Sequence, residues 1–161
     1  MNIELNRVTA DQKSVLNQLL ELYCYDFSEY LNTDVDEKGL FKYKYQDEYF
    51  QEDDRHAFFI NVDGKLAGFV LVNKDLKLAK EGYCIAEFFI LKKYRNKGLG
   101  TKAAHLAFNQ FKGHWEVSVI TINQPATQFW LKAIDQYTDG EFQSRSKMYN
   151  NREKLFLLFN A

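Results

Sequence analysis

The fold is decided by the stretch Ala86-Glu87-Phe88-Phe89-Ile90-Leu91-Lys92-Lys93-Tyr94-Arg95-Asn96-Lys97-Gly98-Leu99-Gly100-Thr101. It begins as an apolar strand with one acid, Glu87, passes through a basic turn with two glycines, and leads into a helix. Glycines let a backbone approach a bulky anion, and the free N–H groups of a helix's first turn point at such an anion. The turn therefore predicts a pyrophosphate site.

Three phosphate-binding motifs compare with this turn. A Walker A loop needs Gly-x-x-x-x-Gly-Lys-Ser/Thr, which the chain lacks. A dinucleotide fingerprint is formally matched by Gly98-x-Gly100-x-x-Ala103, but residues 92–97 separate the strand from its first glycine, and no acid ends the next strand. The third motif is Arg-x-x-Gly-x-Gly, which residues 95–100 match in full.

The rest of the chain predicts one domain over residues 1–161 in which helices alternate with strands. The expected strands are 3–7, 57–62, 65–72, 84–91, 115–122, 141–148 and 154–159. The first expected helix opens with a capping box at Thr9 and has its apolar face over 15–22. Short helices are expected near 25–31 and 46–51, and two further helices over 101–111 and after the cap residue Asn123. This order predicts a mixed sheet in an α/β or α+β domain.

Composition excludes several classes of protein. No apolar stretch approaches the ~18–20 residues of a membrane span, so no membrane partner is expected. The N-terminus lacks a secretory pattern, and Cys24 and Cys84 lie far apart, so two reduced thiols in a cytoplasmic protein are expected. The net charge of −1 divides into −7 over residues 1–60 and +6 over 61–161. A sequence pI near 6.3 is far from that of nucleic-acid binders, so no nucleic-acid partner is expected.

The Arg-x-x-Gly-x-Gly turn resembles the pyrophosphate motif of the GNAT N-acetyltransferase superfamily, whose members bind acetyl-CoA. The predicted element order is similar to that of GNAT domains, and residues 123–130 are similar to their Asn-x-x-Ala-x-x-aromatic segment. The chain also resembles a bacterial subgroup of predicted acetyltransferases. The matching segments are 25–29, 34–37, 64–69, 86–89, 115–117 and 137–138.

The resemblance implies the GNAT fold, with about seven strands, mostly antiparallel, flanked by helices. A central parallel pair would splay apart between Phe88–Leu91 and Val117–Thr121. It implies acetyl-CoA as cosubstrate and no metal. The implied cofactor contacts are the backbone of Phe89, Ile90 and Leu91, the turn Arg95, Asn96, Lys97, Gly98, Leu99, Gly100 and Thr101, and Asn123 near the pantetheine.

The implied reaction is direct attack of a primary amine on the thioester. Glu87 is the candidate base because it is the only acid of an apolar strand, where burial raises a carboxyl pKa. The alternative is a structural carboxylate bonded to backbone or tyrosine. Many GNAT enzymes carry a tyrosine acid where this chain has Trp130, and Tyr137, seven residues on, is the second candidate acid.

The first helices of GNAT folds wall the acceptor site, which makes Tyr25, Asp26, Glu29 and Tyr30 the candidate acceptor contacts. Their acidic, tyrosine-rich segment predicts a small cationic or polar amine. A homodimer is common among such proteins, but nothing in the sequence specifies one. The rival functions are a non-catalytic acyl-CoA sensor or interaction module and, as a distant third, a dinucleotide-binding oxidoreductase.

Overall fold

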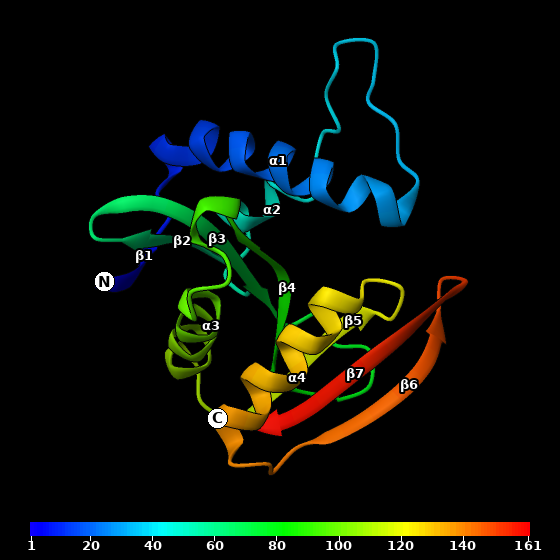
Figure 1. Cartoon of the computed structure of the whole chain (residues 1–161). Helices are drawn as coiled ribbons and strands as arrows, with labels where there is room; N and C mark the ends of the chain where they lie inside the picture. The colour runs from blue at the N-terminus through cyan, green and yellow to red at the C-terminus, as the bar shows by residue number, and fades with distance from the viewer.

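The computed structural model describes residues 1–161 and contains one seven-stranded sheet in the order β1-β2-β3-β4-β5-β7-β6 (Figure 1). Only β4 and β5 pair in parallel, which confirms the mixed, mostly antiparallel sheet. The strands are β1 Ile3–Arg7, β2 His56–Val62, β3 Lys65–Asn73, β4 Tyr83–Ile90, β5 His114–Ile120, β6 Gln143–Tyr149 and β7 Arg152–Asn160. The α-helices are α1 Lys13–Leu31, α2 Glu48–Gln51, α3 Leu99–Gln110 and α4 Gln124–Thr138.

Helix α1 is longer than the sequence predicts. The expected break between a helix over 15–22 and another near 25–31 is wrong, because one helix runs from Lys13 to Leu31. Its buried stripe of Leu16, Leu19, Leu20 and Tyr23 keeps helical spacing and continues into the aromatic segment. The aromatic side chains therefore extend the apolar face of the helix.

Successive residues of β3 show how the sheet separates two helical layers. Phe69 and Leu71 pack in the cluster that contains α1, whereas Val70 and Val72 pack with α3 and α4. This follows from the pleat, which turns successive side chains to opposite faces. In Figure 1, α1 accordingly lies on one side of the sheet, with α3 and α4 on the other. Below, the α1 face means the side of the sheet that α1 covers.

Two-residue turns join the hairpins at the positions that the sequence predicts. Asp63-Gly64 joins β2 to β3, and Asn150-Asn151 joins β6 to β7. The asparagines have φ angles of 49° and 60°, as a type I′ turn requires at both central positions. The second turn extends the β6–β7 hairpin beyond the end of β5, toward the C-terminal end of α1 (Figure 1).

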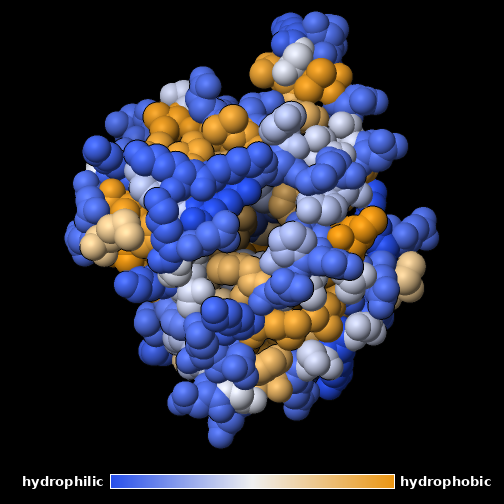
Figure 2. All heavy atoms as spheres, in the orientation of Figure 1, coloured by the Kyte–Doolittle hydropathy of each residue, from blue (hydrophilic) through white to orange (hydrophobic).

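Residues 32–47 form an arm that leaves the end of α1 and projects from the body of the molecule (Figure 1). The carboxylate of Glu21 holds the returning limb, because it accepts hydrogen bonds from the backbone N–H groups of Phe41 at 2.8 Å and Lys42 at 2.9 Å. Figure 2 shows apolar side chains on this projection, where Val35, Leu40 and Tyr45 are exposed. No helix of the chain combines the length and hydropathy that crossing a bilayer requires.

Candidate active site

The parallel strands β4 and β5 pair over a short stretch and then separate. Tyr83, Cys84 and Ile85 pair with Trp115, Glu116 and Val117, and no pairing follows. The strands therefore splay beyond Ile85 and Val117, as the sequence predicts except that Val117 itself is still paired. The Leu91 N–H donates to the Ala67 carbonyl at 2.8 Å, so by the pleat Phe89 also faces β3 and the Ile90 N–H points away from it. Among the three predicted backbone contacts, Ile90 thus offers an amide to the opening.

The glycine turn presents unpaired amides at the start of α3. Gly98 is the N-cap residue with φ of 72°, a left-handed conformation that glycine adopts without strain. The first backbone bond runs from the Lys102 N–H to the Gly98 carbonyl at 3.3 Å. The N–H groups of Leu99, Gly100 and Thr101 precede the first acceptors of the helix and lack a backbone partner. Such a terminus fits a pyrophosphate.

Arg95 lies on the same turn but is already engaged. Its Nε donates to the Ile90 carbonyl at 2.6 Å, and its guanidinium forms an ion pair with Asp26 of α1. Lys92 adds a longer contact to Asp26, 3.8 Å between Nζ and the carboxylate. The structure therefore places Asp26, a predicted acceptor contact, beside the predicted cofactor turn, where it links α1 to that turn.

Glu87 of β4 is held by two phenols from separate segments. The Tyr23 hydroxyl of α1 and the Tyr43 hydroxyl of the arm both donate to its carboxylate, the latter at 3.0 Å. Burial raises the pKa of Glu87 to about 7, although the two phenol hydrogen bonds and the charge of Lys154 act in the opposite direction. Burial and the neighbouring carboxylate raise the pKa of both tyrosines, which stay protonated donors. Glu87 can therefore bind or release a proton near neutral pH.

The sequence analysis allowed a tyrosine bonded to Glu87 as the structural alternative, but it did not identify Tyr23 and Tyr43 as the partners. A signal for Tyr23 exists, since it follows Leu16, Leu19 and Leu20 on the buried stripe of α1. A buried hydroxyl needs a polar partner, and Glu87 is the only acid of the apolar strand beneath it. No comparable pattern marks Tyr43, because it lies on the arm.

The predicted residues of α4 serve the helix and the core. Asn123 caps the helix, with its Oδ1 accepting from the Ala126 N–H at 3.1 Å. Trp130 is buried and packs edge-on against Phe88, with ring centroids 5.1 Å apart. The Tyr137 hydroxyl donates to Asn109 of α3 at 2.8 Å. Tyr137 thus has a structural partner, two turns beyond Trp130.

The other predicted acceptor contacts occupy the C-terminal turns of α1. Tyr25 is 65% exposed, and Glu29 and Tyr30 lie near the helix end. None of them is a hydrogen-bond partner of Glu87. Arg152 of β7 donates to the carbonyls of Tyr30 and Leu31, both at 3.3 Å, and so joins the hairpin to the end of α1.

The acids of residues 1–60 are largely engaged within the protein. The carboxylate of Asp36 pairs with Lys42 at 2.6 Å, and Glu52 pairs with Arg55 at 2.7 Å. Asp47 pairs with Lys13, and Asp26 with Arg95. Lys13, Lys42 and Arg55 are already counted in the net charge of −7 over residues 1–60, so among these four pairs only Asp26 with Arg95 reduces that charge.

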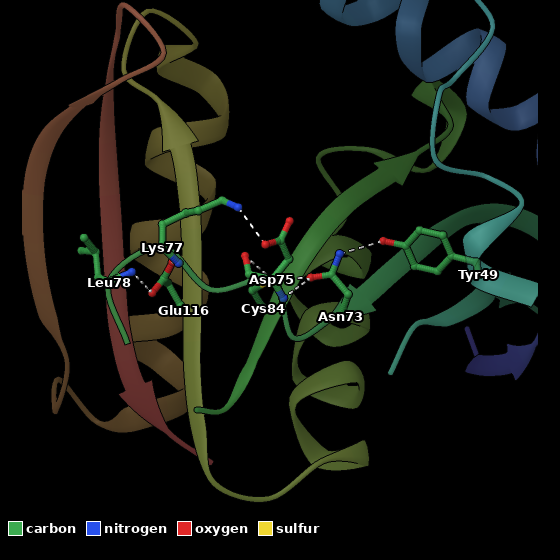
Figure 3. Close-up of polar contacts among 7 residues, drawn as sticks. All are labelled: Tyr49, Asn73, Asp75, Lys77, Leu78, Cys84 and Glu116. Carbon is green, nitrogen blue, oxygen red and sulfur yellow. Dashed lines mark hydrogen bonds and ion pairs between the residues drawn. The ribbon is translucent and has the colours of Figure 1, made fainter. Parts of the chain in front are cut away.

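A buried carboxylate fastens the β3–β4 loop across the sheet. Glu116 of β5 is 2% exposed and accepts three backbone N–H bonds, from Lys77 at 2.7 Å, Leu78 at 2.9 Å and Ala79 at 3.1 Å. Figure 3 shows this loop lying over β5, and Asn73 beside it bonded to Tyr49. Sequence reasoning gave Glu116 no role, although a lone acid within an apolar strand is a signal for such a contact.

Comparison with known proteins gives a family and a fold. The model of the acetyltransferase (GNAT) family matches residues 16–134. No curated protein sequence matches the chain. An acetyltransferase from Thermus thermophilus superposes with a TM-score of 0.68 at 15% identity, over 100% of this chain and 98% of that one.

Two further solved structures contain CoA or acetyl-CoA. Spermidine N-acetyltransferase from Vibrio cholerae, in complex with CoA and spermine, has a TM-score of 0.66 at 10% identity, over 98% of this chain and 95% of that one. NAA60 from Arabidopsis thaliana, in complex with acetyl-CoA, has a TM-score of 0.65 at 14% identity, over 99% and 98%. At these identities the likeness concerns the fold, which is the GNAT fold. With the family match over residues 16–134, this fold makes the chain a member of the GNAT family of acetyltransferases.

Proposed function

We propose that the protein is an acetyl-CoA-dependent N-acetyltransferase that acetylates the primary amine of a small polar acceptor by direct attack. The observation that carries the proposal is the position of Glu87, a carboxyl with a pKa of about 7, on the strand that lines the splayed opening. Acetyl-CoA supplies the activated acetyl group. The unpaired amides of Leu99, Gly100 and Thr101 would hold its pyrophosphate.

Glu87 is proposed as the base. An alkyl ammonium has a pKa of ~10, so the acceptor must lose a proton before its nitrogen attacks. Tyr23 and Tyr43 orient the carboxylate and keep it within the opening. Because they donate to Glu87, they favour its ionised form, which accepts the proton directly or through water.

The Ile90 amide is proposed to stabilise the negative charge that develops on the thioester oxygen. Its N–H points into the opening, whereas the Leu91 N–H already donates to Ala67. The Arg95 guanidinium bonded to the Ile90 carbonyl orients the same peptide segment. Asn123 lies at the N-terminus of α4 and remains a proposed contact of the pantetheine arm.

The departing thiolate is proposed to take its proton from solvent. Trp130 stands where many GNAT enzymes carry a tyrosine, and its indole packs against Phe88. Because the Tyr137 hydroxyl donates to Asn109, Tyr137 is not proposed as the acid. A thiol with a pKa near ~8.5 leaves adequately without a dedicated acid.

The test is CoA release in the presence of acetyl-CoA, a thiol reagent and a panel of primary amines. We expect release that depends on the acceptor, and a loss of kcat/KM of about 100-fold or more for Glu87→Gln. The matched control is Glu81→Gln, an exposed acid of the β3–β4 loop, which should retain activity. Equal activity of both variants would show that Glu87 is not the base.

The second candidate is an acyl-CoA sensor that retains the fold without catalysis. The observation in its favour is the absence of a tyrosine acid, with Trp130 packed into the core. Calorimetry separates the two functions. Tight acetyl-CoA binding without CoA release across small amines, peptides and aminoglycosides would favour the sensor.

A further inference from the structure

Beyond the point where β4 and β5 part, the sheet carries a lysine on the α1 face. Lys154 of β7 lies opposite Ile120 of β5, beyond Val117, where β5 has already left β4. Counted by the pleat from Ile120 back to Glu116, Lys154 shares the face on which Glu116 binds the β3–β4 loop. Glu87 lies on this same face, because its partner Tyr23 belongs to α1.

Lys154 lacks an acidic partner. No carboxylate forms an ion pair with it, although Lys77, nearby, is paired with Asp75 at 2.9 Å. Its nearest described contact is the ring of Tyr149, with Nζ 5.2 Å from the centroid. The Lys77 ammonium lies 5.7 Å from the same centroid, so two cations share one aromatic ring. Glu87 is held by phenols instead.

The position of Lys154 disfavours its charge. The side chain is partly buried, and this burial lowers the pKa of Lys154, as do the charges of Lys77 and Arg152, while Glu87 opposes the shift. The charge of Glu87 acts on Lys154, but the two groups are not within ion-pair distance, so an anion that binds the partly buried ammonium directly stabilises it. The wall around Lys154 thus has an unmet preference for negative charge.

The cationic character extends over the hairpin. Arg145, Lys147 and Arg152 lie on β6 and β7 in register with residues of the Lys154 face. Arg152 is bound to the carbonyls of Tyr30 and Leu31, so it also fixes the hairpin against α1. Since α1's Asp26 is paired with Arg95, that acid does not offset the positive wall.

We propose that the acceptor carries an anionic group, a carboxylate or a phosphate, beside its amine, and that Lys154 binds this group. The inference rests on the proposed N-acetyltransferase function and names its substrate class as a zwitterionic amine. Glu87 binds the ammonium group and Lys154 the anionic group, so the two side chains bind opposite charges of one small molecule.

The experiment compares matched acceptors. Each L-amino acid is paired with its amide and its decarboxylated amine, and phosphoethanolamine is paired with ethanolamine. We expect kcat/KM at least tenfold higher for the anionic member of one arm, and the preferred arm distinguishes carboxylate from phosphate. The amide is intrinsically less protonated near neutral pH, so this preference runs against nucleophile availability.

Variants assign the preference to the lysine. Lys154→Met should raise the KM of the anionic acceptor about tenfold and leave that of its neutral partner unchanged. Lys154→Arg should retain most of the preference, and Lys132→Met, an exposed lysine of α4, should have no effect. Calorimetric binding of the acceptor to the CoA complex, where no turnover occurs, should show the same tenfold loss for Lys154→Met.

The outcomes separate the two proposals. The zwitterion inference is overturned if neutral or cationic amines are acetylated with no preference for anionic ones. It is also overturned if Lys154→Met leaves such a preference intact. In both cases the proposed function still stands. If acetyl-CoA binds but no amine of any arm is acetylated, the proposed function fails, and the inference built on it fails as well.

Discussion

Replacing Glu87 by glutamine tests whether ionisation of this buried carboxyl destabilises the folded protein. The folded-state pKa of about 7 lies above the ordinary value of 4.5, so folding favours the protonated form. This stabilisation is complete below pH 4.5 and is lost as the pH rises through about 7. At about 1.4 kcal/mol per pH unit, the difference corresponds to about 3 kcal/mol.

Glutamine is neutral at every pH and can still accept a hydrogen bond from one of the two tyrosines. The stability of wild type relative to Glu87→Gln should therefore fall by about 3 kcal/mol between pH 4 and pH 8. Urea unfolding at a series of pH values measures this difference, and other titrating groups cancel in the comparison. The variant should be the more stable protein at pH 8 and the inactive one.

One control sharpens this result. Glu81→Gln removes an exposed acid from the β3–β4 loop, so its difference curve should be nearly flat over the same range. A flat curve for Glu87→Gln as well would refute the reasoning, because it would mean that the carboxylate is as well solvated in the folded protein as in the unfolded chain.

Three further predictions concern the cofactor turn and the strand joints. Gly98→Asp should abolish acetyl-CoA binding in calorimetry, whereas Gly98→Asn, which also tolerates the left-handed φ of 72°, should retain part of it. Equal affinities of the two variants would mean that the pyrophosphate does not bind at this turn. Asp26→Asn should tighten acetyl-CoA binding about two- to fivefold by releasing Arg95; a rise in acceptor KM with unchanged acetyl-CoA affinity would instead make Asp26 an acceptor contact. Glu116→Gln should cost about 2 kcal/mol in urea unfolding and speed hydrogen exchange at residues 77–79, and unchanged exchange would contradict the anchoring role.

Local patterns predicted most of the fold. The two-residue turns, the capping box at Thr9 and the apolar runs each depend on neighbours in sequence, and the structure contains all of them. The predicted bounds of α3 were late, because the helix begins at Leu99 instead of Thr101. Gly98 has no Cβ to mark a helix start, yet its positive φ places it at the N-cap.

The pairing of polar groups was less predictable. Asp26 has an acidic neighbourhood in the sequence, but its partner Arg95 lies 69 positions away and reaches it through the packing of α1 on the sheet. Tyr43 reaches Glu87 only because the arm returns along the middle of α1, where Glu21 holds it. Charge counts along a chain do not show which charges form pairs once helices dock, so the sequence could not show that Asp26 pairs with Arg95.

The short pairing of β4 with β5 leaves a joint in the sheet that few hydrogen bonds cross, here called the seam. By strand pairing, only three residue pairs join the half-sheet β1–β4 to the half-sheet β5–β7; the Glu116 contact with residues 77–79 and the core shared by Val72 and Val117 reinforce them. The two chain ends belong to different halves, so a load applied at Met1 and Ala161 crosses the seam. The resistance of this junction to such a load therefore depends more on the core beneath α3 and α4 than on the hydrogen bonds of the sheet.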